Sequence, residues 1–383
     1  MSAWLAGSVG SVIPATPGRR ERWRQGLGNA RVVSARDAIL QLMQTFPAVR
    51  VAELDVDETG RGWPLPGERW AVHHRGAREV LVLDRQFEPI WRVGLLSAWG
   101  EVCAVADDLS LLACSRGREV RLLDGTGGQV ARVHLASPGP VRGDASCVFA
   151  RDGRHLWAHA FVDGRDELWL IDLAEFKVVD HRRLDTWAVG FTPFHHPDGQ
   201  TIGLELPEGQ DGCAIRWVRP AGGRIELCCA PGFDRVLADL HRSGREYLTT
   251  PHGMGDNELL RHHFDDDRVI ARLPLAVSLP ASDAWDAQDR WEQWYYCAGY
   301  LTDEVILASV ENESHHWHAL VKRSPMGVLG RVDYGPKVWA PGWFLPPQAG
   351  TWVTISRTRT QRWELAEQPS ERFGTQLSLL EQT

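Results

Sequence analysis

Lysine is almost missing from this sequence, and so is any long apolar run. Three lysines stand among the 42 basic residues of a chain of 383, a bias typical of GC-rich bacterial genomes. The net charge is −8, and arginine forms no basic stripe dense enough to neutralise a phosphate backbone, so we predict no nucleic-acid partner. No stretch of about 18 apolar residues occurs, which argues against a membrane-spanning helix and a membrane partner.

Catalytic and cofactor signatures are lacking as well. The chain has no GxSxG elbow, no phosphate-cradling GxxxxGK[ST] loop and no HExxH motif. His316 and His318 would share one face of a strand close to Glu311, but zinc needs three or four ligands and nothing in the sequence supplies a third. We therefore predict no cofactor and no metal site, and an enzymatic activity is the less favoured alternative.

Paired cysteines are also absent. The seven cysteines are an odd number and form no CxxC motif, and only Cys228 and Cys229 are neighbours. Most of the others lie in strand-like runs, where a small buried thiol is usual. The pattern predicts reduced, unbridged cysteines and a cytoplasmic protein.

The sequence does contain a repeated unit of four short strands. It is clearest at residues 145–184, where residues 156–161 alternate small and large side chains after an Asp-Gly turn. A two-residue breaker between the first two strands recurs seven times, at intervals of 41 to 59 residues. The seven breakers are Pro66-Gly67, Asp107-Asp108, Asp152-Gly153, Asp198-Gly199, Ser243-Gly244, Thr302-Asp303 and Ala349-Gly350.

A second repeated feature has the same spacing as the seven breakers. Seven third strands follow these turns, at residues 79–84, 119–124, 167–172, 214–219, 259–264, 317–322 and 361–366. Periods of about 40 to 50 residues with four strands per unit are typical of propeller blades, because one small sheet cannot bury both faces alone. We predict an all-β, seven-bladed β-propeller of four-stranded antiparallel blades over residues 49–383, with residues 49–56 as the innermost strand of the first blade.

The repeat resembles the WD-repeat family of propellers, in particular its degenerate bacterial relatives. Three of the third strands end in aspartate, at Asp84, Asp124 and Asp172. None of the seven third strands ends in the Trp-Asp pair that names the family, and the Gly-His dipeptide at the start of its blades is absent. The resemblance implies a propeller fold and leaves the function to be argued from a site.

Residues 1–48 precede the predicted propeller as an arm and a short helix. Ser34 is a suitable N-cap for a helix over residues 35–45, where Ile39, Leu42 and Met43 have helical spacing. Ring closure has two alternatives. The outer strand of the seventh blade is either residues 373–380 or an N-terminal strand near residues 31–34.

The connections of the predicted propeller fall into two classes. The turns that join strands one and two, and strands three and four, are short, as at residues 151–154 and 219–223, and share what we call the short-turn face. The other connections are longer and share the opposite, long-loop face. They include residues 136–144, 205–212, 251–257, 275–290, 311–315 and 333–341. Binding residues concentrate on loops that a rigid scaffold holds, so we predict the functional surface on the long-loop face.

The interval of 59 residues between Gly244 and Asp303 is the largest departure from the blade period. It places the predicted site on blades five to seven, and the candidate binding residues are His252, Asp256, Trp285, Trp291, Glu311, His315 and Trp339. We predict a binding or assembly platform that engages a protein or peptide there. The alternative is an enzyme or a carbohydrate-binding protein with a funnel-shaped site for a small molecule or sugar on the same face. Polar groups that converge on the central channel would favour this alternative, and an apolar patch on a flat rim would favour the platform.

Overall fold

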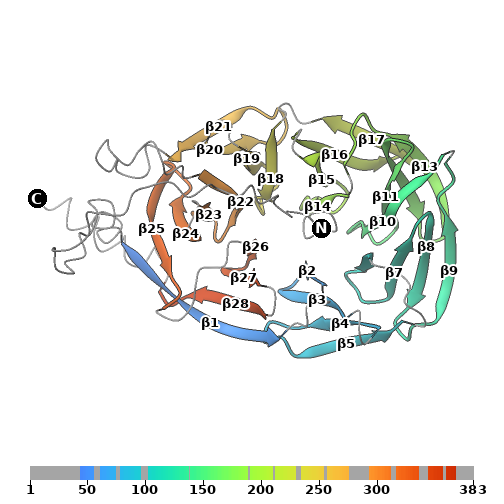
Figure 1. Ribbon diagram of the computed structural model, residues 1–383, viewed down its shortest axis with the longest axis horizontal. Coiled ribbons are helices and arrows are strands. Elements are labelled where there is room, and N and C mark those ends of the chain that lie inside the picture. The colour runs from blue at the N-terminus through green and yellow to red at the C-terminus, as the bar shows by residue number, and fades with distance from the viewer. Residues whose placement is uncertain are drawn as a thin grey trace, which may run out of the picture.

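The chain forms a ring of small antiparallel sheets around a central channel, viewed down its axis in Figure 1. The computed structural model describes residues 44–55, 61–74, 78–95, 102–137, 139–188, 190–209, 212–229, 234–253, 257–275, 293–311, 316–335, 344–356 and 359–367. Among these residues, no helix is both long enough and apolar enough to cross a membrane. Seven four-stranded units make up the ring, as the sequence predicts.

The first four blades are regular four-stranded sheets whose strands follow one another from the channel outward. Blade one contains β2 (Arg61–Leu65), β3 (Arg69–His74), β4 (Glu79–Leu83) and β5 (Pro89–Gly94). Blade two contains β6 (Val102–Val105), β7 (Leu111–Arg116), β8 (Glu119–Asp124) and β9 (Gln129–His134). Blade three contains β10 (Val141–Phe149), β11 (His155–Val162), β12 (Arg165–Asp172) and β13 (Lys177–Arg183). Blade four contains β14 (Thr192–His195), β15 (Ile202–Pro207), β16 (Cys213–Ala221) and β17 (Arg224–Cys229).

The last three blades continue the ring, and the seventh takes its outermost strand from the start of the described chain. Blade five contains β18 (Arg235–Leu240), β19 (Glu246–Pro251), β20 (Glu258–His263) and β21 (Val269–Pro274). Blade six contains β22 (Gln293–Tyr300), β23 (Val305–Glu311), β24 (His316–Lys322) and β25 (Gly327–Asp333). Blade seven contains β26 (Phe344–Gln348), β27 (Thr351–Ile355), β28 (Arg359–Leu365) and β1 (Thr45–Asp55). All seven predicted turns and all seven predicted third strands are confirmed.

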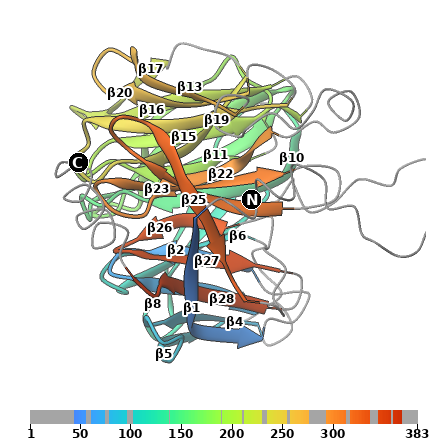
Figure 2. The same cartoon turned by 90° about the vertical axis from the view of Figure 1, so that its left-hand side faces the viewer.

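Strand β1 closes the ring. It pairs antiparallel with β28 from Ala48 to Asp55, and its first three residues pair in parallel with the end of β25. Figure 2 shows β1 lying against both strands. One strand therefore completes blade seven and ties it to blade six, which joins these two blades into a single eight-stranded sheet.

This closure corrects one prediction. Residues 49–56 were expected to form the innermost strand of blade one, but β2 occupies that place and Val49 lies on the outermost strand of blade seven. Strand β1 pairs with the edge of β28. The two proposed closing strands, residues 373–380 and residues near 31–34, lie outside the described residues. The predicted helix over residues 35–45 also lies outside them, except for its last residues, where Thr45 begins β1.

The core consists of seven apolar clusters, one between each pair of neighbouring blades. Strand β11 shows how the sequence builds two of them. Leu156, Ala158 and Ala160 pack toward blade two, whereas Trp157 packs toward blade four. Because successive strand residues point to opposite faces of the sheet, a central blade must be apolar on both faces.

Aspartates fix the short turns. Asp124 accepts the backbone N–H groups of Thr126 and Gly128 at 2.8 and 2.9 Å. Asp198 accepts those of Gln200 and Thr201, both at 2.8 Å. Such side-chain-to-backbone bonds favour tight turns, so these side chains shape the short-turn face and are not available to a ligand.

Candidate functional site

The structure describes only two residues of the predicted site on the long-loop face. Five of its residues lie outside the described residues: Asp256, Trp285, Trp291, His315 and Trp339. His252 and Glu311 are described, at the ends of β19 and β23 in blades five and six. The aromatic row described next connects these two residues.

An aromatic row runs across the long-loop side of blades five and six. The ring of His252 stacks on Tyr296 with centroids 5.9 Å apart, and Tyr296 lies 4.9 Å from Tyr295. Tyr295 meets His316 edge to face at 5.7 Å, and the Nδ1 atom of His316 lies 3.6 Å from a carboxylate oxygen of Glu311. The two described members of the predicted site are therefore parts of one continuous surface.

Each end of the aromatic row carries a polar group in a poorly solvated place. The side chain of His252 is 8% exposed, and among the described residues its buried Nε2 atom has no hydrogen-bond partner. Burial raises the pKa of Glu311, which accepts a hydrogen bond from the Gln293 amide at 2.6 Å. Buried polar atoms are nearly always paired, so the Nε2 atom of His252 is an exception within this row.

His318, which the sequence analysis considered with His316 as a possible metal ligand, packs between two blades. It is fully buried and hydrogen-bonds to the Tyr334 hydroxyl between blades six and seven. It also meets the Phe344 ring edge to face at 4.9 Å. His316 and His318 therefore do not form a shared metal edge, and the described residues contain no group of three potential ligands that could hold a metal ion.

The sequence analysis missed Trp187, which lies on the link between β13 and β14. Its ring is 45% exposed, whereas its backbone is held on both sides. The Trp187 N–H donates to Glu208 at 3.2 Å, and the next N–H, of Ala188, donates to the buried Asp166 at 2.7 Å. Asp166 in turn contacts the buried His159 at 3.0 Å. A tryptophan in the middle of an inter-blade link was the available signal.

A cavity of about 1080 Å³ occupies the central channel near the short-turn face. Its walls are the innermost strands of all seven blades and the turns that follow them. Several of these inner edges carry prolines (Pro64, Pro193, Pro346 and Pro347), which lack the N–H that another strand would need for pairing. A channel lined in this way is suited to a compact ligand and disfavours an added strand.

Polar groups converge on one wall of this cavity from three consecutive blades. Asp107, Arg151 and His195 line it from blades two, three and four. The Nε atom of Arg151 lies 3.6 Å from the Asp107 carboxylate. Burial and the nearby Arg151 charge lower the pKa of His195 to about 3, so its imidazole is neutral near pH 7.

The opposite wall carries a second polar group of residues, from blades five and six. Asp239 accepts the N–H groups of Tyr300 and Leu240, each at 2.8 Å. Burial raises the pKa of Asp239 to about 7, although these two hydrogen bonds act against the shift. This carboxyl group changes its charge near physiological pH at the channel wall.

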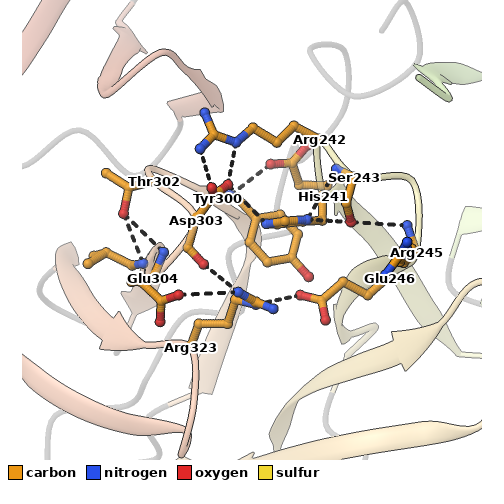
Figure 3. A network of polar contacts seen from close by, with 12 residues as sticks. His241, Arg242, Ser243, Arg245, Glu246, Tyr300, Thr302, Asp303, Glu304 and Arg323 are labelled. Carbon is orange, nitrogen blue, oxygen red and sulfur yellow. Dashed lines mark hydrogen bonds and ion pairs between the residues drawn. The ribbon is translucent and has the colours of Figure 1, made fainter.

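Figure 3 shows the ion-pair network that joins blades five and six beside this wall. Glu246 accepts from Arg261 at 2.6 Å and from Arg323 of the neighbouring blade at 2.9 Å. Arg323 also donates to the Asp303 carbonyl at 2.7 Å, and Arg242 pairs with the Asp303 carboxylate. These charges satisfy one another, so we assign the network to blade adhesion.

Comparison with known proteins identifies the fold of the chain but does not assign the chain to a family. No family model matches the chain, and no curated protein matches it in sequence. Among solved structures, the chain is similar to the β-propeller domain of Cps50 (Swd1) from Myceliophteria thermophila, with a TM-score of 0.53 and 14% identity. The match covers 84% of this chain and all of that domain. A likeness at this identity shows a WD-repeat-like propeller fold and leaves the function to the site.

Proposed function

We propose that this protein is a cytoplasmic binding platform that holds a protein or peptide partner on its long-loop face, with Trp187 as one anchor. Five large hydrophobic side chains are exposed among the described residues, and four of them (Val49, Ile90, Val130 and Ile270) lie singly on the outermost strands of four different blades. Trp187 alone is aromatic and lies on an inter-blade link. Exposed tryptophans on a rigid backbone are typical anchors of protein interfaces.

The aromatic row of blades five and six supports the same face. Tyrosine and histidine rings offer contact area at a small entropic cost, and they are enriched in binding patches. A partner that covers Trp187 and this row would span blades three to six.

The state of the cysteines supports the cytoplasmic location. Cys147, Cys213, Cys228 and Cys297 are free thiols among the described residues. Cys228 is exposed and survives unpaired most readily in a reducing compartment.

The experiment compares Trp187→Ala with Ile90→Ala, a matched removal of an exposed hydrophobic side chain from an outer strand. Partners captured from a lysate by the immobilised wild-type chain are identified, and their affinities for both variants are measured. Loss of an aromatic anchor costs about 2 kcal/mol, so Trp187→Ala should weaken binding about 30-fold while its melting temperature stays unchanged. Ile90→Ala should bind as the wild type does.

A photo-crosslinking residue locates the contact directly. Trp187→p-benzoylphenylalanine should form an adduct with the captured partner, and Ile90→p-benzoylphenylalanine should not. Equal capture by Trp187→Ala and the wild type, or crosslinking from position 90 alone, contradicts the proposed face.

A second candidate function is the binding of a small molecule in the channel. The polar groups on the two walls of the cavity favour it, because they converge from five blades on one concave space. This cavity lies near the short-turn face, opposite to the face on which the sequence placed a funnel.

A further inference from the structure

Arg151 is an arginine whose hydrogen-bonding capacity is largely unused. Its side chain is 35% exposed, and among the described residues its ionic contact is the ion pair from Nε to Asp107 at 3.6 Å. That separation exceeds the length of a hydrogen bond. A guanidinium carries five N–H donors in a planar fork, and at Arg151 no described residue accepts a hydrogen bond from the two terminal nitrogens.

The other arginines beside the channel mouth are engaged. Arg69 donates to the carbonyl oxygens of Pro66 and Asp107 at 2.7 and 2.8 Å. Arg242 pairs with both carboxylate oxygens of Asp303. Arg151 therefore differs from its counterparts in the neighbouring turns by having a free fork that lines a cavity.

His195 supplies a neutral partner beside this fork. It lines the same wall of the cavity, and among the described residues its imidazole makes no hydrogen bond. Because the positive charge of Arg151 helps to keep the ring neutral, His195 can donate one N–H without adding charge. A fork and a neutral donor on one wall match the acceptor geometry of a carboxylate.

Asp107 is a weak competitor for the fork. Burial raises the pKa of Asp107, which shows that its negative charge is poorly solvated, although Arg151 acts against the shift. The carboxylate of Asp107 is 39% exposed and does not approach the guanidinium within hydrogen-bond distance. An incoming anion that reached both terminal nitrogens would displace it.

Apolar side chains line the cavity between its two polar walls. Trp63, Phe149, Phe191, Phe194 and Leu345 face it from four blades. A volume of about 1080 Å³ is at the upper end of the range for small-molecule sites, about 300 to 1,000 Å³. The cavity thus combines a corner that carries Arg151 and His195, an opposite wall that carries Asp239, and apolar side chains between them.

We propose that this cavity binds a small amphipathic organic anion, with its carboxylate on Arg151 and His195 and its hydrocarbon part against the apolar innermost strands. The site is separate from the long-loop face, so it stands or fails independently of the protein-binding function. Asp107 acts as the internal counter-ion that the ligand replaces.

The test uses 2-naphthoate and its neutral analogue 2-naphthalenemethanol, measured by calorimetry on the full chain. We expect the carboxylate to bind more tightly than the alcohol. Arg151→Gln should weaken naphthoate binding about tenfold, the scale of one charge-assisted contact, and should leave the alcohol unaffected. Asp107→Asn should strengthen naphthoate binding several-fold because it removes the competitor.

Arg154→Gln is the matched control. Arg154 lies in the same turn, is paired with Asp172 at 3.2 Å and does not line the cavity, so its loss should not change naphthoate binding. Arg151→Lys keeps the charge and should retain part of the affinity, which preserves the test if Arg151→Gln folds poorly. The Asp107→Asn measurement is also independent of that variant.

Several results overturn the proposal. Naphthoate that gives no binding heat at millimolar concentration, equal affinities for carboxylate and alcohol, or unchanged binding in both Arg151→Gln and Asp107→Asn each exclude an anion site on Arg151. Stronger naphthoate binding by Arg151→Gln together with weaker binding by Asp107→Asn would contradict an anion site and would show a site for cations. Tighter binding of acetyl-phenylalanyl-alanine than of naphthoate would assign the cavity to the carboxyl terminus of a protein chain and overturn the small-molecule assignment.

Discussion

The two faces of this propeller use their side chains in different ways. On the short-turn face, Asp198 gives its carboxylate to three donors of its own turn at 2.7 to 2.8 Å. Glu246 binds Arg261 of its own blade and Arg323 of the neighbouring blade. On the long-loop face, Trp187 is 45% exposed to solvent. The difference separates groups that hold the ring together from a group that remains available to a ligand.

The central channel is the exception on the short-turn face. Arg151 comes from the same kind of turn as Asp198, and His195 is the last residue of strand β14, just before such a turn. Both residues line the cavity. A residue's position in the repeat therefore does not decide its role. What matters is whether its polar atoms are satisfied by the chain.

The largest expected effect concerns the ion-pair network of blades five and six. Glu246→Gln leaves two arginine charges without a carboxylate in a buried place, and losing one partner of a buried ion pair costs about 3 to 5 kcal/mol. Chemical denaturation should show this loss in the free energy of unfolding. Glu226→Gln, which breaks an exposed pair with Arg219, should leave it unchanged. Similar stability of both variants would mean that the network does not hold the blades together.

The next effect is a pH dependence caused by Asp239. Its folded pKa of about 7 lies above the ordinary value of 3.8, so ionisation is harder in the folded chain. The protonated Asp239 carboxyl therefore contributes to the free energy of unfolding. This contribution is complete below about pH 4 and is lost as the pH rises through 7, by up to about 4 kcal/mol. We expect the wild type to lose stability relative to Asp239→Asn between about pH 4 and pH 8. Parallel stability curves for the two proteins would refute the assignment.

The smallest effect is expected at a single turn. Asp198→Ala removes three hydrogen bonds from an exposed turn and should lower the free energy of unfolding by about 1 kcal/mol. The loss should vanish in acid, because the hydrogen bonds of its turn hold the pKa of Asp198 below 3.8 in spite of its partial burial, and stability from a lowered pKa disappears as the pH falls through it. Gln200→Ala in the same turn is the control, and an equal loss there would remove the special role of Asp198.

The sequence predicts the local parts of this fold well, because their signals are local. The turn at Asp152-Gly153 and the alternation from Leu156 to Ala160 follow from turn chemistry and from burial on two faces. The place of Val49 does not follow in this way. Innermost and outermost strands carry similar alternation, and β1 finds its place only by pairing with β28 near the other end of the described chain.

The candidate site also depends on contacts between distant parts of the chain, which local sequence signals do not predict. The prediction relied on the largest departure from the blade period, so it selected residues such as Trp285 that lie outside the described residues. It missed Trp187, which lies on the link between blades three and four. Arg151 and His195 come together only because consecutive turns surround one channel. No spacing in the sequence reveals which turn residue faces that channel.

The separation of the two faces is the central claim, and one crossed measurement tests it most directly. Partner affinity and 2-naphthoate affinity are measured on both Trp187→Ala and Arg151→Gln. We predict that Trp187→Ala loses about 30-fold in partner affinity and keeps naphthoate binding, while Arg151→Gln loses about tenfold in naphthoate affinity and keeps the partner. If either variant weakens both ligands to the same extent, the two faces do not carry separate sites and the account is contradicted.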